Sequence, residues 1–216
     1  MRYELKYVFN SNQIYKINKW LYSIKNLKKI YKPRRVNSIY YDDAEFTCAQ
    51  NNIDGISERK KYRLRWYNNN INKNFYEIKL KKNKLSKKII YKSKNEINFH
   101  NIKKLFSYEN INFEDINFKK HLTDKSLEPK LKVSYDRVYY ITGKVRITID
   151  KNLIFSLFDN FSFSRNLKDE RIILEIKFEE NNFIDGLQLI NNCFTSPVRF
   201  SKYVRGLSLC GIANYF

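Results

Sequence analysis

The stretch from Arg59 to Lys81 alternates between hydrophobic and charged residues in two successive runs, which an Asn-rich segment separates. Successive side chains of a β-strand point to opposite faces, so this pattern predicts a β-hairpin with one apolar and one ionic face. The apolar parity carries Tyr62, Leu64 and Trp66 on the first run and Tyr76, Ile78 and Leu80 on the second. The ionic parity carries Lys61, Arg63, Arg65, Glu77, Lys79 and Lys81.

The same charge pattern recurs far away in the sequence. Pairs of a carboxylate and a cation occur at Glu4-x-Lys6, Glu77-x-Lys79 and Glu175-x-Lys177, with Arg146-x-Thr148-x-Asp150 between the last two. An ordinary half-exposed antiparallel sheet would produce this alternation with its charges in water. Charges on one parity of five or more strands cannot all be buried against a hydrophobic layer, because unpaired buried ions cost several kcal/mol each. A closed barrel with an ionic lumen and the apolar parity outside, under helices, resolves the conflict.

The remaining periodicity predicts an α+β fold, with an antiparallel closed β-barrel of about eight strands and helices packed outside, in a single domain that covers residues 1–216. Further strands are expected at residues 2–9, 34–42, 84–91, 130–141, 144–150, 153–158, 171–178 and 198–203. Helices are expected from residue 12 to about 26 with Ser11 as cap, from Asp42 or Asp43 through residue 50, from 96 to about 107, from Asn181 or Asn182 to about 193, and after residue 203. Residues 161–169 are expected to form a loop, and residues 108–127 show no clear pattern.

One arginine disturbs the alternation of the predicted strand 130–141. Arg137 falls in phase with the apolar residues Leu131, Val133 and Tyr135. Either this arginine faces outward, or a bulge near Asp136 turns it towards the ionic side.

The charge balance narrows the class of partner. Lys and Arg number 42 against 22 Asp and Glu, for a formal charge of +20. A field of this sign attracts polyanions such as nucleic acid, anionic lipid, nucleotides or polyphosphate. Base stacking by the many Tyr and Phe residues is disfavoured because they lie mostly on the core parity, and no RRM or KH motif occurs, so nucleic acid is the weaker interpretation.

Cysteine and histidine usage excludes several chemistries. Cys48, Cys193 and Cys210 are widely spaced and include no C-x-x-C pair, which predicts buried free thiols in a reducing compartment. The chain contains two histidines, which disfavours a zinc centre and a His-based catalytic triad. No run of 18 apolar residues occurs, so we expect a soluble, cytoplasmic protein.

The carboxylates on the ionic parity allow two interpretations. Each can pair with a neighbouring Lys or Arg, or it can hold a hard divalent metal that bridges to a phosphate chain, since Mg²⁺ and Mn²⁺ prefer oxygen ligands. The arginines offer forked donors suited to phosphate oxygens, and the lysines offer compact charges.

Eight motifs in one order carry a family resemblance. They are Arg2-Tyr-Glu-Leu-Lys-Tyr7, Val36-Asn-Ser-Ile-Tyr-Tyr-Asp42, Lys61-Tyr-Arg-Leu-Arg-Trp-Tyr67, Tyr76-Glu-Ile-Lys79, Val133-Ser-Tyr-Asp-Arg137, Val145-Arg-Ile-Thr-Ile-Asp150, Leu174-Glu-Ile-Lys177 and Ser201-Lys-Tyr203. Together they resemble the VTC domain of polyphosphate polymerases, a branch of the triphosphate tunnel metalloenzymes related to the CYTH phosphatases.

The resemblance implies a tunnel that binds the triphosphate of ATP, uses Mn²⁺ or Mg²⁺, and transfers the terminal phosphoryl group to a polyphosphate chain. It implies that phosphates are held by Lys6, Arg63, Arg65, Lys79, Arg137, Arg146, Lys177 and Lys202. Further substrate contacts are expected from Lys61, Lys81, either Lys87 or Lys88, and Ser201. Glu175 would bind the metal, with Glu4 and Glu77 as the other candidates. A phosphate-binding Arg137, as the resemblance implies, has to face the ionic side, which favours the bulge near Asp136.

The sequence also departs from the related families. Arg2 stands where the CYTH pattern has a glutamate, which leaves Glu4 as the only acid of that strand and weakens a two-metal hydrolytic site. No SPX domain and no membrane segment accompany the motifs, so a eukaryotic-type extruding complex is not expected, although a separate membrane partner is compatible. Hydrolysis of triphosphate or tripolyphosphate in the same tunnel is the alternative activity, and a basic nucleic-acid-binding module is the second alternative.

Overall fold

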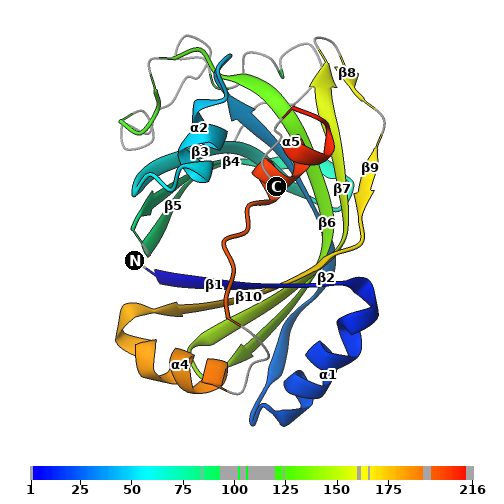
Figure 1. The fold of residues 1–216 in the computed structure, drawn as a ribbon, viewed down its shortest axis with the longest axis vertical. Coiled ribbons are helices and arrows are strands. Elements are labelled where there is room, and N and C mark those ends of the chain that lie inside the picture. The colour runs from blue at the N-terminus through cyan, green and yellow to red at the C-terminus, as the bar shows by residue number, and fades with distance from the viewer. Residues whose placement is uncertain are drawn as a thin grey trace.

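The computed structural model describes residues 2–83, 85–92, 102, 106, 120–123, 125–159, 162–164, 166–191 and 196–212. Strands within these residues form an antiparallel sheet that closes into a ring (Figure 1). The strands are β1 (Arg2–Phe9), β2 (Lys28–Asp42), β3 (Glu58–Tyr67), β4 (Asn70–Lys82), β5 (Leu85–Lys92), β6 (Glu128–Thr142), β7 (Val145–Asp159), β8 (Ser162–Phe163), β9 (Leu167–Asp169) and β10 (Ile172–Glu179). The helices are α1 (Ile14–Ser23), α2 (Thr47–Ile53), α4 (Phe183–Asn191) and α5 (Lys202–Leu209), with 3-10 turns at Ser11–Gln13 and Glu180–Asn182.

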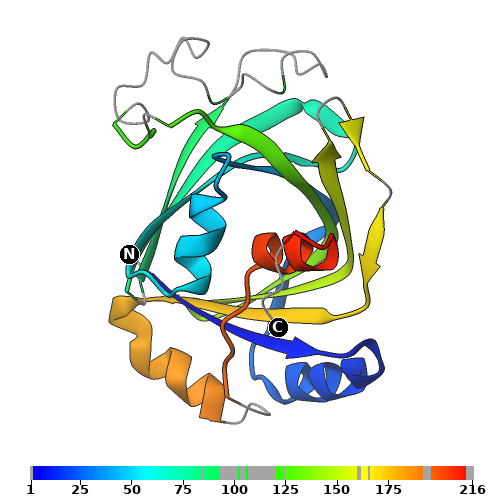
Figure 2. The same cartoon turned by 45° about the horizontal axis from the view of Figure 1, so that its top comes forward.

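The strand order explains the closure. Neighbours follow the order β10-β1-β5-β4-β3-β2-β6-β7-β8, β9 pairs with β7, and a further pairing of β10 with β7 joins the two ends of the sheet. The predicted α+β closed barrel is therefore confirmed. Helices α1 and α4 lie outside the ring, beside β1 and β10, whereas α5 lies within the outline of the ring in both views (Figures 1 and 2).

Two hydrophobic clusters cover the outside of the barrel, as the parity predicts. One joins Leu64, Ile78 and their neighbours on β2, β3 and β4 to Ile102 and Phe106. The other joins the outer residues of β1, β7 and β10 to Ile17, Trp20 and Leu21 of α1. These apolar faces hold the charged parity of the same strands towards the lumen.

A third cluster lies inside the ring and was not predicted. Leu131, Val133 and Tyr135 of β6 pack with Phe155 of β7 and with the apolar side of α5. A Cβ atom at Gly206 would overlap the side chains of Leu131 and Phe155, so glycine permits this close approach of α5 to the barrel wall. One end of the lumen is therefore filled by apolar residues rather than being ionic throughout.

This inner cluster also decides the orientation of Arg137. The pairing of β6 with β2 continues without a register shift from Tyr135 to Arg137, so these two side chains point the same way. Both face the lumen because the apolar parity of β6 itself faces inward. The irregularity opposite Asp136 lies on β7, where the register advances by an extra residue at Asn152, which has φ +54°. The predicted irregularity near Asp136 is present and Arg137 faces the ionic side, but the irregularity does not turn Arg137 relative to Tyr135; the alternative that Arg137 faces outward is wrong.

Several predicted boundaries shift. Residues 144–150 and 153–158 form one strand, β7, and the expected loop 161–169 contains β8 and β9. The first helix ends at Ser23, and its entry is fixed by the Asn10 N–H donating to Gln13 Oε1 rather than by Ser11. Asp42 and Asp43 do accept N–H groups of α2, from Cys48 at 2.8 Å and Thr47 at 2.8 Å.

The predicted final strand at 198–203 is absent. Residues 196–201 belong to no strand, the backbone is extended at Ser201, and α5 already begins at Lys202. A backbone hydrogen bond from Val198 N–H to the Lys6 carbonyl, at 2.8 Å, ties this segment to β1.

The expected helix at 96–107 and most of 108–127 lie outside the described residues, as does Cys193. Cys48 and Cys210 are free and half-buried. In the described part of the chain, no helix is long and apolar enough to cross a bilayer.

The outer cluster supports a stability prediction. Leu64 is fully buried in it, so Leu64→Ala removes apolar contacts and leaves a cavity. We expect a loss of about 2–5 kcal/mol in the free energy of unfolding, measured by urea denaturation. Lys73→Ala, at an exposed position of β4, is the control; a loss as small as that of Lys73→Ala would place Leu64 outside the core.

Candidate active site

The sheet register brings the charged residues of seven strands onto one inner face. Lys6 lies opposite Glu175, and Glu4 opposite Lys177, across β1 and β10. Arg63 lies opposite Glu77 across β3 and β4, and the same parity continues from strand to strand around the ring. The inner face therefore carries Lys61, Arg65, Lys79, Lys81, Lys88, Arg137, Arg146 and Asp150 as well.

The structure decides between Lys87 and Lys88 and leaves the predicted site residue Arg146 exposed. Lys87 pairs with Leu80 on the outer parity and is exposed, whereas Lys88 pairs with Lys79 on the inner face, so the register selects Lys88 from the two alternatives. Arg146 shares the inner parity with Lys177, its partner on β10, but it is exposed.

Glu77 is the centre of one charge cluster. It is 2% exposed, and its Oε2 lies 2.6 Å from Arg63 Nη2 and 3.5 Å from Arg65 Nη1, while its Oε1 lies 3.0 Å from Lys88 Nζ. Burial raises the pKa of Glu77, but the three cations outweigh burial and hold the pKa well below its usual range. Both oxygens of Glu77 thus position cations.

Glu175 and Glu4 form a second cluster on adjacent strands. Glu175 Oε2 lies 2.8 Å from Lys177 Nζ and 3.5 Å from Arg137 Nη2, and its Oε1 lies 4.0 Å from Lys6 Nζ. Glu4 accepts a short bond from Lys79. Burial raises the pKa of Glu4 and Lys79 lowers it, with a net pKa of about 2, while the pKa of Glu175 falls well below its usual range because its cations outweigh burial.

Asp150 anchors the entry of α5 to the barrel wall. This fully buried carboxylate accepts from Arg137 Nη2 at 2.7 Å and lies 2.6 Å from Lys202 Nζ, which also sits 4.7 Å from the Tyr135 ring. Because an unpaired buried charge is costly, the pair fixes Lys202 at the lumen. The sequence placed Asp150 on the ionic parity but did not reveal this role.

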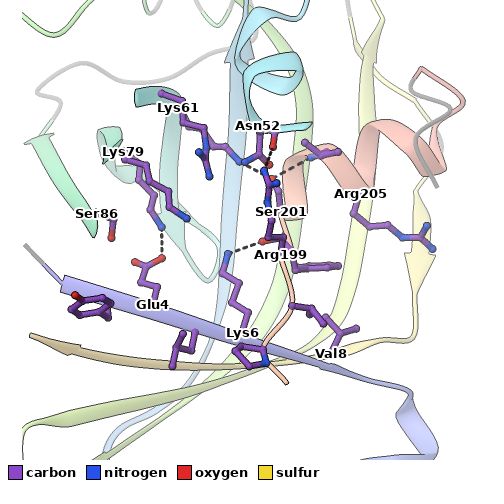
Figure 3. A pocket seen from close by; sticks show the side chains of 18 of the residues that line it. Glu4, Lys6, Val8, Asn52, Lys61, Lys79, Ser86, Arg199, Ser201 and Arg205 are labelled. Carbon is purple, nitrogen blue, oxygen red and sulfur yellow. Dashed lines mark hydrogen bonds and ion pairs between the residues drawn. The ribbon is translucent and has the colours of Figure 1, made fainter. Parts of the chain in front are cut away.

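The segment before α5 closes one side of a cavity of about 1070 Å³ (Figure 3). Lys6 Nζ donates to the Phe200 carbonyl at 2.8 Å, and Lys61 Nζ donates to Ser201 Oγ at 2.7 Å. Glu4, Lys79 and Ser86 line the same cavity, and Figure 3 shows the Glu4 carboxylate pointing towards Lys79. Two lysines of the predicted site therefore hold this segment in place.

Two inner hydroxyls were missed by the sequence reasoning. Thr148 Oγ1 and Ser86 Oγ are buried and make no hydrogen bond within the described residues. Both lie on the inner parity, Thr148 opposite Glu175 and Ser86 opposite Lys81. Buried polar groups are rarely left unpaired, so these hydroxyls are available to a ligand in the lumen.

The lysine pKa values predict a pH dependence of anion binding. Burial, reinforced by Arg59, lowers the pKa of Lys81 to about 8, and burial, opposed only in part by Glu175, lowers the pKa of Lys177 to about 8. A bound polyanion favours the protonated lysines, so tripolyphosphate binding should take up protons near pH 8 and weaken as the pH rises above 8. Titration calorimetry in buffers of different ionisation enthalpy measures both effects.

A matched pair of variants controls this prediction. Arginine stays charged throughout the range, so Lys81→Arg combined with Lys177→Arg should flatten the pH profile. Affinity that is constant or rises through pH 8 in the unmodified protein would contradict the predicted proton uptake.

The carboxylates fit a divalent ion only in combination with phosphate. In the described part of the chain no three or more Asp, Glu, His or Cys residues form a group that could hold a metal by themselves. Mg²⁺ and Mn²⁺ typically take one or two carboxylates and complete their shell with water and substrate phosphates. Glu175 and Glu4 lie close enough for each to influence the other's pKa and match that donor set, whereas Glu77 is fully engaged with its cations.

An antiparallel barrel whose lumen gathers lysine, arginine and buried carboxylates defines the class of triphosphate tunnel folds. The VTC domain family matches residues 1–210, so the chain belongs to this family. A comparison with curated proteins finds no match to this sequence.

Solved structures share the fold at low sequence identity. A candidate adenylate cyclase from Bacillus halodurans matches with a TM-score of 0.58 and 10% identity, over 95% of this chain and 96% of that chain. A candidate adenylyl cyclase from Hippeastrum, described as having a dominant triphosphatase activity, matches with a TM-score of 0.51 and 13% identity, over 96% of each chain. The Mediator head module of Schizosaccharomyces pombe matches with a TM-score of 0.53 and 10% identity, over 91% of this chain and 97% of that chain. The fold thus occurs in proteins with different roles, so the residues of the lumen, and not the fold, determine the function.

Proposed function

We propose that this protein is a polyphosphate polymerase-like phosphotransferase that uses ATP as donor and a polyphosphate chain as acceptor. One observation carries the proposal: the lumen gathers cations well in excess of the four carboxylates Glu4, Glu77, Asp150 and Glu175. The cations with an inner position are Lys6, Lys61, Arg63, Arg65, Lys79, Lys81, Lys88, Arg137, Arg146, Lys177 and Lys202. A phosphate chain compensates such an excess, and membership of the VTC domain family supports the same ligand.

The chain's own residues would act by positioning and by neutralising charge. Arg63 and Arg65 present forked donors that Glu77 holds in place, while Lys6, Lys177 and Arg137 surround Glu175. A terminal oxygen of the acceptor chain attacks the γ-phosphorus of ATP, the bond from that phosphorus to the β–γ bridging oxygen breaks, and ADP leaves. Phosphoryl transfer depends mainly on alignment and on stabilising charge on the moving group, so no general base is required.

Glu175, with Glu4 beside it, is the proposed holder of Mn²⁺ or Mg²⁺. When bound, the ion would neutralise phosphate charge and orient the phosphate oxygens. The lumen lysines and arginines would meanwhile bind the remaining phosphate oxygens and exclude water from them.

The proposal is tested by incubating the protein with ATP and Mn²⁺ and resolving the products on a gel stained for polyphosphate. Long chains are expected. Release of orthophosphate without chains would overturn the polymerase and support the second candidate, a triphosphatase. That candidate is favoured by the fold shared with the Hippeastrum protein and its triphosphatase activity.

The unpaired Thr148 hydroxyl gives a further prediction. Thr148→Val keeps the shape of the side chain and removes a buried hydroxyl that has no partner among the described residues. The fold should be unaffected or slightly stabilised, because an unsatisfied polar group disappears. Tripolyphosphate affinity, measured by calorimetry, should fall roughly fivefold to tenfold through the lost hydrogen bond. Unchanged affinity would show that Thr148 does not contact the ligand.

A further inference from the structure

A long segment near the start of the chain contains no acidic residue. Between Leu5 and Tyr41 the sequence contains nine Lys and Arg residues and no Asp or Glu. Since the whole chain has 22 acids in 216 residues, about one in ten, a 37-residue stretch without any is an unusual local bias. This segment contains the second half of β1, all of α1 and most of β2.

Helix α1 divides this segment into a buried and an exposed side. Ile17, Trp20 and Leu21 are buried against the barrel. Tyr15 and Tyr22 are 62% and 91% exposed. Residues separated by four and seven positions share one side of a helix, so Tyr15, Lys19 and Tyr22 form a single solvent-facing stripe.

The start of β2 and the β6–β7 turn extend this stripe. Lys28 and Lys29 of β2 pair with Ile141 and Tyr140 of β6, and Lys29 Nζ lies 5.9 Å from the Tyr140 ring. The link from α1 is tied to the turn because Thr142 Oγ1 donates to the Lys25 carbonyl at 3.0 Å. We call the exposed residues of this surface the α1 cationic face: Tyr15, Lys19, Tyr22, Lys25, Lys28, Lys29 and Lys144.

The charges of the α1 cationic face are not neutralised locally. Within the described part of the chain, none of its lysines has a carboxylate in ion-pair range. Acidic residues occur near α4, with Glu180 in the 3-10 turn before this helix and Asp185 in its first turn. Figure 1 shows α1 and α4 as separate helices on the outside of the ring, so the cationic face is confined to the α1 end.

We propose that the α1 cationic face is a docking surface for an anionic lipid bilayer. Tyrosine favours the boundary between water and lipid because its ring is apolar and its hydroxyl is polar, and lysines reach the headgroups with extended side chains. Two tyrosines and a lysine on one side of a helix, flanked by further lysines, provide both features. The contact is peripheral, with α1 lying along the surface and its buried side remaining on the barrel.

The arrangement fits a bilayer better than a nucleic acid. Proteins that bind single strands collect aromatic rings in a cationic groove so that successive bases stack. Here the rings stand on the outside of a helix, and Tyr15 and Tyr22 are seven residues apart, about 10 Å along the helix axis. A flat, negatively charged surface can contact both rings and the intervening lysine at once.

The experiment is co-sedimentation of the full chain with vesicles of phosphatidylcholine alone or with phosphatidylserine added. We expect binding only to the phosphatidylserine vesicles, and weaker binding as salt rises. Lys25→Gln, Lys28→Gln and Lys29→Gln combined should weaken binding by roughly a hundredfold, since each lysine near an anionic membrane contributes roughly fivefold. Tyr15→Ser combined with Tyr22→Ser should weaken binding without altering the charge.

The matched control replaces three exposed lysines elsewhere, Lys73→Gln, Lys92→Gln and Lys168→Gln. An equal loss in this control would show that net charge alone drives binding, and the proposal would fail. It would also fail if no vesicles were bound at low salt. Retention of single-stranded RNA that depends on the same lysines and tyrosines, without vesicle binding, would assign the surface to nucleic acid instead. Variants of the α1 cationic face should bind tripolyphosphate as the unmodified protein does, which verifies that they fold.

Discussion

Glu175→Gln should abolish metal-dependent turnover while leaving the lumen able to bind phosphate. Glutamine keeps the shape of the side chain but removes the charge that would hold a divalent ion against the phosphates. Even residues that only support a metal ligand typically cost ten- to hundredfold when changed, so the ligand itself should cost about a hundredfold or more in turnover. The measurement is phosphate transfer from ATP as a function of Mn²⁺ concentration.

The charges around Glu175 make this variant informative. Lys177, Arg137 and Lys6 lie within 2.8–4.0 Å of its oxygens, so neutralising it leaves three cations less compensated. Some stability is lost, yet tripolyphosphate should bind at least as well, because its charges replace the missing carboxylate. Binding by calorimetry therefore separates a failed fold from a failed reaction.

A surface carboxylate provides the matched control for Glu175. Glu58 pairs with Lys82 at 2.8 Å and is well exposed, so Glu58→Gln removes a carboxylate from a lysine without touching the lumen. Its turnover should match that of the unmodified protein. Near-normal turnover and unchanged Mn²⁺ dependence in Glu175→Gln would reduce Glu175 to a partner of its lysines and leave Glu4 as the metal candidate.

The sequence predicted the inner face well where one parity of a strand was charged and the other parity was apolar. Within β1, β3, β4 and β10, the stretches 2–7, 61–66, 76–81 and 174–178 alternate charged with apolar residues, so parity alone separates lumen from core there. The structure places Lys6, Arg63, Lys79 and Glu175 on the inner side accordingly. Where a strand departs from this rule, parity still identifies which residues share a face, but not which face is the lumen.

Strand β6 illustrates that limit. Its inner side is both apolar and ionic, because Leu131 and Val133 pack on α5 while Arg137 meets Asp150. The presence of a helix inside the ring is a tertiary fact, and it depends on the close approach that Gly206 allows. No local pattern in residues 130–141 encodes it.

The prediction of a strand at residues 198–203, just before α5, was wrong for a related reason. Val198 and Phe200 alternate with polar residues as a strand would, and the backbone of Ser201 is extended. A ladder also depends on tertiary fit: β1 pairs with β5 only at Arg2 and Tyr3, and at its open edge this segment donates from Val198 N–H to the Lys6 carbonyl without forming a ladder. The choice between Lys87 and Lys88 was equally beyond sequence, because it depends on which residue of β5 lies opposite Lys79.

Arg65→Ala should remove triphosphate affinity and spare the fold. Arg65 is 5% exposed and donates to Ser38 Oγ at 3.2 Å and Tyr135 Oη at 3.3 Å, but it is the looser partner of Glu77 at 3.5 Å. Arg63 and Lys88 continue to neutralise Glu77 in its absence. Hydrogen bonds to charged groups contribute about 1.5–3 kcal/mol, so tripolyphosphate binding should weaken about ten- to hundredfold by calorimetry.

Arg65 is a sharper test than the more deeply paired Arg137. Removing Arg137 would leave the fully buried Asp150 with Lys202 alone, and a broken buried pair costs about 3–5 kcal/mol of stability, which would confuse binding with unfolding. Arg35→Ala is the matched control, since Arg35 pairs with Asp136 at 3.1 Å on the opposite parity of β2 and should leave affinity unchanged.

The conservative variant distinguishes charge from geometry at the same position. Arg65→Lys keeps one positive charge but loses the planar fork that two phosphate oxygens can share, so it should recover only part of the affinity lost in Arg65→Ala. Full recovery would indicate that Arg65 acts as a point charge. Normal affinity in Arg65→Ala, with the fold verified by its urea midpoint, would place the phosphate chain elsewhere in the lumen, towards Lys6, Lys177 and Arg137.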